Sequence, residues 1–163
     1  MTPINIIFSL FFSAFFSFSA IAEMDAAAKI VPLPKKHAKA VAVLFPTEGN
    51  TVSGYFLFEQ KKNGVQVYAQ LQGLTPNASH GVHIHTYGDL RDMKTGKSAG
   101  GHYNPEGHSH GLPPNLKRHA GSFGNVVSNK YGEANFELFD QTFTIAGFKN
   151  PVLGRAVVVH AKP

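Results

Sequence analysis

Histidine is concentrated in the C-terminal half of this chain, where seven of its nine copies fall between positions 83 and 160. The series begins with His83 and His85, which would share one face of a β-strand because side chains alternate with a period of two. Imidazole is the commonest nitrogen ligand for zinc, copper and iron. We therefore interpret the series as a metal site, which requires a fold that brings distant segments together. Its other members are His102, His108, His110, His119 and His160.

The chain contains no cysteine. This excludes disulfides, thiolate ligands and a cysteine nucleophile, so a metal site must use nitrogen and oxygen donors. Fifteen lysines and arginines against ten acidic residues give a formal charge of +5. A modest positive balance can attract small anions. The basic residues are scattered and no aromatic–basic stripe accompanies them, so we expect no nucleic-acid partner.

The first 22 residues carry no charge, and Ile6–Phe18 is an apolar, phenylalanine-rich run. Small residues at Ala20 and Ala22 suit a signal-peptidase site, although no Lys or Arg stands near Met1. A membrane anchor is the alternative, but the run is shorter than the ~20 residues that span a bilayer. We expect residues 1–22 to be a signal peptide and 23–38 a flexible leader. The protein would then be exported, to the periplasm or outside the cell, without stable membrane association.

Residues 39–163 are predicted to form one all-β domain. Alternating apolar and polar residues at 65–72 indicate a half-buried strand, and Asn63-Gly64 before it suits a hairpin turn. Residues 88–129 are rich in Gly, Pro, Asn and Ser with little period, so we expect a long functional loop there. The pattern as a whole favours an antiparallel sandwich or barrel. The expected strands cover residues 40–45, 51–60, 65–72, 80–87, 133–138, 142–146 and 155–161.

Five segments resemble the copper/zinc superoxide dismutases, and they occur in the order of that family and with nearly its spacing. They cover Gly81–Asp89, Ser98–Pro105, His110–Pro113, Arg118–Asn125 and Gly154–His160. The resemblance implies a Greek-key barrel with metals bound outside its wall, here expected to lack the last strand. It also implies conversion of superoxide to oxygen and hydrogen peroxide by Cu(II)/Cu(I) cycling.

The resemblance assigns two metal sets that share one histidine. Copper would be bound by four imidazoles, a donor set that supports both of its oxidation states. In the family's scheme His102 bridges copper and zinc, and it is the catalytic residue that carries a proton to peroxide. The copper set is His83, His85, His102 and His160. The zinc set is His102, His110 and His119.

The chain departs from the family at several positions. Ser122 stands where the family has its zinc-ligand aspartate, and a neutral hydroxyl is a poor zinc ligand, so zinc binding is left open. Three histidines with a water, or recruitment of His108, are the alternatives. Gly96 occupies the position of the first disulfide cysteine, and the chain ends at Pro163. The guiding loop, the anion-orienting arginine and the second cysteine are expected to be absent, in either a truncated chain or a shortened homologue.

Two functions follow from this pattern. The first is a copper-dependent superoxide dismutase, with superoxide steered by positive charge from loop residues. The second is a non-enzymatic exported protein that sequesters or delivers copper. A homodimer is compatible with either function. The loop residues that could supply the positive charge are Lys94, Lys97, Lys117 and Arg118.

Overall fold

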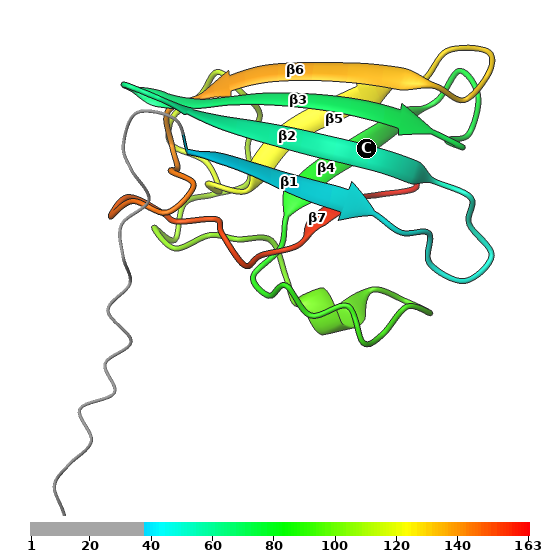
Figure 1. Cartoon of the computed structure of the whole chain (residues 1–163), viewed down its shortest axis with the longest axis horizontal. Coiled ribbons are helices and arrows are strands. Elements are labelled where there is room, and N and C mark those ends of the chain that lie inside the picture. Colours follow the sequence, from blue (N-terminus) through cyan, green and yellow to red (C-terminus); the bar gives the residue numbers. More distant parts are fainter. Residues whose placement is uncertain (1–37) are drawn as a thin grey trace, which may run out of the picture. The chain divides into compact units, whose positions relative to one another are not determined.

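The computed structural model describes residues 38–163, so the predicted signal peptide and nearly all of the predicted leader lie outside the described residues. The described part contains two antiparallel sheets, with β4, β5 and β7 behind the first sheet in the view of Figure 1. Nothing helical in residues 38–163 has the length and apolar character to cross a bilayer. The strands are β1 (Lys39–Leu44), β2 (Ser53–Lys61), β3 (Gly64–Gln72), β4 (Ser79–Ile84), β5 (Ser122–Val127), β6 (Ala134–Asp140) and β7 (Val157–Val159).

The strand orders are β1-β2-β3-β6 in one sheet and β5-β4-β7 in the other. Only the β1–β2 and β2–β3 hairpins and the β4–β5 pair join consecutive strands. β3 pairs with β6 and β4 pairs with β7, so the chain passes between sheets by long connections. Such non-consecutive pairing is typical of a Greek-key arrangement. The predicted all-β antiparallel fold is confirmed.

The core lies between the two sheets and is rich in phenylalanine. Phe58 packs against Phe123 and Phe143 with ring centroids 6.3 and 6.4 Å apart, and Phe123 stacks on Phe143 at 5.6 Å. Aromatic pairs at such distances add to the stabilisation from burial alone. Val82 and Ile84 of β4 join the same cluster and are fully buried. The core therefore fixes β4 from one side, and its other side is free to carry polar side chains.

The predicted strand pattern needs three corrections. Residues 122–127 form β5 inside the segment expected to be a loop. Its alternation is broken because Gly124 adopts a positive φ of 86° beside an irregularity in the β4–β5 pairing, which hides the period of two. Residues 142–146 form only a single bridge, Thr144 to Pro151. β4 ends at Ile84, after which the chain pairs with the loop at residues 99–102.

Candidate metal centre

β4 places His83 and His85 on the side away from the core, as the alternation predicted. Val82 and Ile84 point into the core, whereas the two histidine rings lie among other imidazoles. Both histidines are nonetheless buried, at 6% and 8% exposure, because the long loop covers them. This side of β4 therefore carries the first two histidines of the site.

The backbone of Ile84 anchors the two loop segments that carry further histidines. Tyr103 donates its N–H to Ile84 O at 2.8 Å, and Ile84 donates to Gly121 O at 2.8 Å. Gly121 in turn donates to Tyr103 O at 3.0 Å, which closes the connection. A Cβ at Gly121 would lie 2.4 Å from Ile84 O, so only glycine allows this approach. His102 and His119 are thereby held beside β4.

His160 follows β7 and reaches the site from the other side of β4. Its N–H donates to Gly81 O at 2.8 Å. Its carbonyl oxygen lies 2.9 Å from Nδ1 of His80, a buried histidine that the sequence reasoning did not include in the site. His80 therefore positions the backbone of His160. Its place three residues before His83 was the available signal.

The four histidines predicted to bind copper lie together. Ring centroids are 5.1 Å apart for His83 and His160, 5.2 Å for His85 and His102, and 5.4 Å for His85 and His160. His83 stacks on His102 at 3.8 Å. One ring nitrogen from each of His83, His102 and His160 lies within 4.8 Å of the others. His85 bonds Gly100 O through Nδ1 at 2.7 Å, and its Nε2 lies 3.4 Å from Nε2 of His160.

The three histidines predicted to bind zinc form a triangle. The ring centroids of His102, His110 and His119 are separated by 5.5, 5.8 and 5.3 Å. Three imidazoles around one tetrahedral ion, with metal–nitrogen bonds of about 2 Å, would place their centroids about 5 Å apart. His102 therefore lies beside the rings of both predicted sets, and His83 also approaches His110, with their Nε2 atoms 3.1 Å apart. The structure brings all six predicted ligands into one cluster.

His108 is not part of this cluster. Its Nδ1 lies 3.3 Å from both Arg118 O and Glu106 Oε2, and its backbone N–H donates to Asn104 Oδ1. Its ring makes no aromatic contact with the other histidines of the described chain. His108 thus contacts Arg118 and Glu106, and its recruitment as a substitute zinc ligand stays a prediction.

Burial favours the neutral, metal-binding form of five imidazoles in the cluster. Desolvation, reinforced by the neighbouring imidazoles, lowers the pKa of His83 to about 3 and that of His102 to about 4. Burial also lowers the pKa of His85, His119 and His160. Nδ1 of His83 and Nδ1 of His119 are buried without a hydrogen-bond partner among residues 38–163. Neutral imidazoles with free nitrogens are what a transition metal requires, so the residues fit a bound metal.

These pKa shifts predict an acid-sensitive metal-free protein. The unfolded chain takes up protons at its histidines near pH 6.5, whereas the folded chain resists protonation at the cluster. The unfolded state therefore binds more protons below pH 6.5, and folding stability falls as the pH drops toward 4; above pH 6.5 the cluster contributes nothing. We expect the urea midpoint of the metal-free protein to be lower at pH 5 than at pH 7.5. An equal or higher midpoint at pH 5 would contradict neutral, buried imidazoles.

Arg118 does not contribute to an electrostatic field at the surface, contrary to the sequence-based suggestion. Its guanidinium is 2% exposed and pairs with Asp140, which is 1% exposed. A second guanidinium nitrogen donates to Thr142 Oγ1 at 3.2 Å. Arg118 therefore tethers the histidine-bearing loop to the end of β6.

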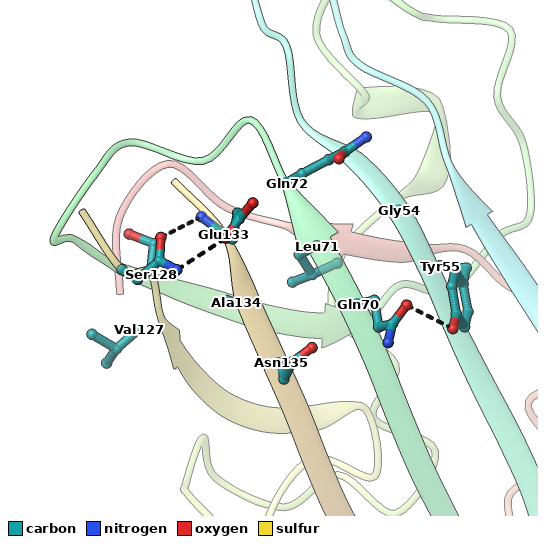
Figure 2. A pocket seen from close by; sticks show the side chains of 11 residues that line it. Gly54, Tyr55, Gln70, Leu71, Gln72, Val127, Ser128, Glu133, Ala134 and Asn135 are labelled. Carbon is teal, nitrogen blue, oxygen red and sulfur yellow. Dashed lines mark hydrogen bonds between the residues drawn. The ribbon is translucent and has the colours of Figure 1, made fainter. Parts of the chain in front are cut away.

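A cavity of about 770 Å³ adjoins the candidate copper ligands. His85 and His160 line it, together with Lys97 and the apolar residues that flank β1 and β7. A second hollow, of about 650 Å³, lies on the first sheet near the β5–β6 turn (Figure 2). Its polar lining includes Tyr55, whose hydroxyl donates to Gln70 at 3.0 Å, but it contains no histidine. Of these two hollows, the first is the one that adjoins the metal centre.

Comparison with known proteins agrees with this geometry. The family model described as "Copper/zinc superoxide dismutase (SODC)" matches residues 52–163. An extracellular Cu-Zn superoxide dismutase of Brugia pahangi is 40% identical over 126 residues, covering 77% of this chain and 61% of that protein. A Cu-Zn superoxide dismutase of Paramecium bursaria Chlorella virus 1 is also 40% identical, over 77% of this chain and 64% of the relative. The chain thus spans less than two thirds of these two relatives.

Two further proteins are matched over a larger share of their own length. Superoxide dismutase [Cu-Zn] 2 of Brassica juncea is 41% identical over 77% of this chain and 79% of that protein. The solved structure of the clock protein EA4 superimposes with a TM-score of 0.68 at 36% identity, covering 78% and 77% of the two chains. The chain belongs to the copper/zinc superoxide dismutase family. Copper and zinc are the metals of this family, and the histidine cluster is where the chain can hold them.

Proposed function

We propose that the chain is a copper-dependent superoxide dismutase, converting superoxide to oxygen and hydrogen peroxide. The observation that carries the proposal is the convergence of four imidazoles from β4, the long loop and the end of β7 beside one cavity. When bound, copper supplies the one-electron redox chemistry. The proposed copper ligands are His83, His85, His102 and His160.

The protein's part in this chemistry is to hold the imidazoles in place. His85 is oriented by Gly100 O, and the His160 backbone is fixed by His80 and Gly81. A hydrogen bond on one ring nitrogen selects the tautomer that leaves the other nitrogen free for a metal. Partial burial favours the uncharged form of the rings. These contacts support a preorganised copper site.

His102 is the proposed proton carrier. Reduction of superoxide to hydrogen peroxide consumes one electron and two protons, so a group beside the reacting oxygen has to supply a proton. His102 lies between the copper and zinc sets, with contacts to His160 on one side and His119 on the other. Its two ring nitrogens can therefore serve the two sets separately. We expect it to release one of the two protons and to recover it from solvent.

The cavity beside His85 and His160 is the proposed route for superoxide. Lys97 lines it, and a positive charge there favours the approach of a small anion. Asp89 and Asp92 also line the cavity. Asp89 is paired with Arg91, and Asp92 accepts from the backbone N–H groups of Lys94 and Thr95 and from the Thr95 hydroxyl, which limits their repulsion of an anion. Lys97→Gln is expected to slow the reaction more at low than at high salt. Salt-independent rates in both proteins would contradict steering by Lys97.

The test is a superoxide-disproportionation assay on the purified chain loaded with copper, with and without zinc. Excess EDTA is present to chelate copper that is not bound by the protein, so that this copper does not contribute activity. We expect activity that survives EDTA and rises in proportion to bound copper. Activity no greater than that of copper–EDTA without protein, in a chain that still binds one copper tightly, would overturn the enzyme and support the copper-sequestering alternative.

The N-terminal sequence supports export of the protein. Residues 1–22 carry no charge and are the proposed cleaved signal peptide. Residues 23–38 are the proposed leader, and residues 39–163 are the proposed metal-binding domain. A relative whose printed name is extracellular is consistent with secretion. Mass spectrometry of the exported protein should find Glu23 at its N-terminus. Recovery of an intact Met1 from the cytoplasm would contradict this proposal.

A second copy of the chain is the proposed partner for an exposed apolar surface around β1. Val41, Val43 and Leu153 are 60%, 58% and 59% exposed, and Val41 and Leu153 line a common hollow. Among residues 38–163, β1 pairs only with β2, so within this part of the chain its other edge is open to another strand. Sedimentation should show a dimer that Val41→Lys dissociates. A monomer at all concentrations would exclude it.

A further inference from the structure

Ser122 lies on the metal-binding side of the second sheet. In the β4–β5 register Val82 is opposite Gly124, and after a shift His83 is opposite Ser122. Residues directly opposite each other on paired strands project to the same side. The neighbouring Phe123 is in the core, so Ser122 faces the histidines. Its N–H donates to His119 O at 3.0 Å, which ties it to the zinc set.

The hydroxyl of Ser122 is buried and has no partner. The residue is 0% exposed, and Oγ makes no hydrogen bond within residues 38–163. Nδ1 of His119 is orphaned in the same region. Buried polar atoms are almost always hydrogen-bonded, so two orphans on one side of the sheet indicate a ligand that satisfies them.

Within residues 38–163, the two acidic side chains bonded to the segment that carries His102, His110 and His119 are both engaged. Glu106 accepts from Asn150 and lies 3.3 Å from His108 Nδ1. Asp140 is engaged by Arg118 and Thr142. A divalent ion on His102, His110 and His119 would therefore have three neutral donors and no compensating carboxylate. Three protein ligands with the fourth position left to solvent are typical of an open rather than a closed zinc site.

We propose that Ser122 makes the zinc set an open site, in which water or a small monoanion fills the fourth position and hydrogen-bonds to Ser122 Oγ. The inference rests on the proposed function, because it assumes that His102, His110 and His119 hold a divalent ion. The uncompensated charge of that ion favours a negatively charged ligand. The serine hydroxyl, as a single donor, suits a compact ligand of this kind.

The experiment uses Co²⁺ as the probe in the full chain, with the copper set first filled by one equivalent of Cu⁺, which has no visible d–d bands. Azide is then titrated and the Co²⁺ absorption spectrum recorded. We expect a saturable spectral shift in the wild-type protein. Ser122→Asp should abolish the shift and raise zinc affinity, measured by chelator competition, by roughly tenfold or more. Ser122→Ala should retain the shift with azide binding weakened roughly three- to tenfold.

Several outcomes would overturn the proposal. An azide-insensitive Co²⁺ spectrum, failure of Co²⁺ to bind, or an unchanged response in a folded Ser122→Asp protein would each do so. His110→Ala should remove the Co²⁺ bands and His160→Ala should not; the reverse would place the probe elsewhere and refute the assignment. Failure of Cu⁺ to bind stoichiometrically would instead count against the proposed copper function, so the two failures are distinguishable.

Discussion

Replacing His160 by alanine is expected to lower the affinity of the chain for copper by more than about 100-fold. Loss of a residue that only orients a ligand typically costs 10–100-fold, and loss of a ligand itself should cost more. His160 is the proposed copper ligand that follows β7, and its ring contacts His83, His85 and His102. Its removal leaves three imidazoles and opens the site to the adjoining cavity.

Copper affinity is measured by competition with a chromophoric chelator, and dismutase activity is followed on the same samples. His108→Ala is the matched control, because it also removes one imidazole but lies outside the cluster. We expect the control to retain both affinity and activity. Equal affinities in the wild type and in His160→Ala would show that copper binds elsewhere.

Replacing Asp140 by asparagine is expected to destabilise the protein by roughly 3–5 kcal/mol, because it leaves a buried guanidinium without its counter-charge. The two side chains of the Arg118–Asp140 pair are 2% and 1% exposed. Asp140 also accepts from the backbone and the hydroxyl of Thr142. The substitution therefore disrupts a connected network that joins the end of β6 to the loop preceding His119.

Urea denaturation of the metal-free protein at pH 7.5 measures this loss. Glu137→Gln is the control, because it makes the equivalent change at an exposed position on the same strand. The control should change stability by less than about 0.5 kcal/mol. We also expect weaker zinc binding by Asp140→Asn, since Arg118 precedes His119. A loss below about 1 kcal/mol would show that the pair contributes no more than an exposed one.

The positions of His83 and His85 in the proposed copper site could be predicted from the sequence, because side chains alternate between the two faces of a strand. The alternation of Val82 and Ile84 with His83 and His85 separates the core side from the metal side, and no tertiary information is needed to predict it. The co-location of His102, His119 and His160 came from the family resemblance. Its physical basis is the set of backbone bonds around Ile84 and Gly81, which the residue pattern alone does not reveal.

Three features could not be predicted from the sequence, because they depend on irregular backbone or on partners far away in the chain. β5 was hidden by the positive φ of Gly124 and the shifted register beside His83. The burial of Arg118 depends on Asp140, 22 residues later in the chain. The role of His80 depends on a carbonyl 80 residues away. None of these contacts produces a local periodicity, so sequence patterns could not predict them.

The most direct test of the copper centre is X-ray absorption spectroscopy of the full chain loaded with one equivalent of Cu²⁺. The scattering from imidazole rings beyond the first shell counts the histidines that bind the metal. We predict a fit to four imidazoles, reduced to three in His160→Ala and unchanged in His108→Ala. A copper ion bound by two or fewer imidazoles, or by mainly oxygen donors, would contradict the assignment of His83, His85, His102 and His160.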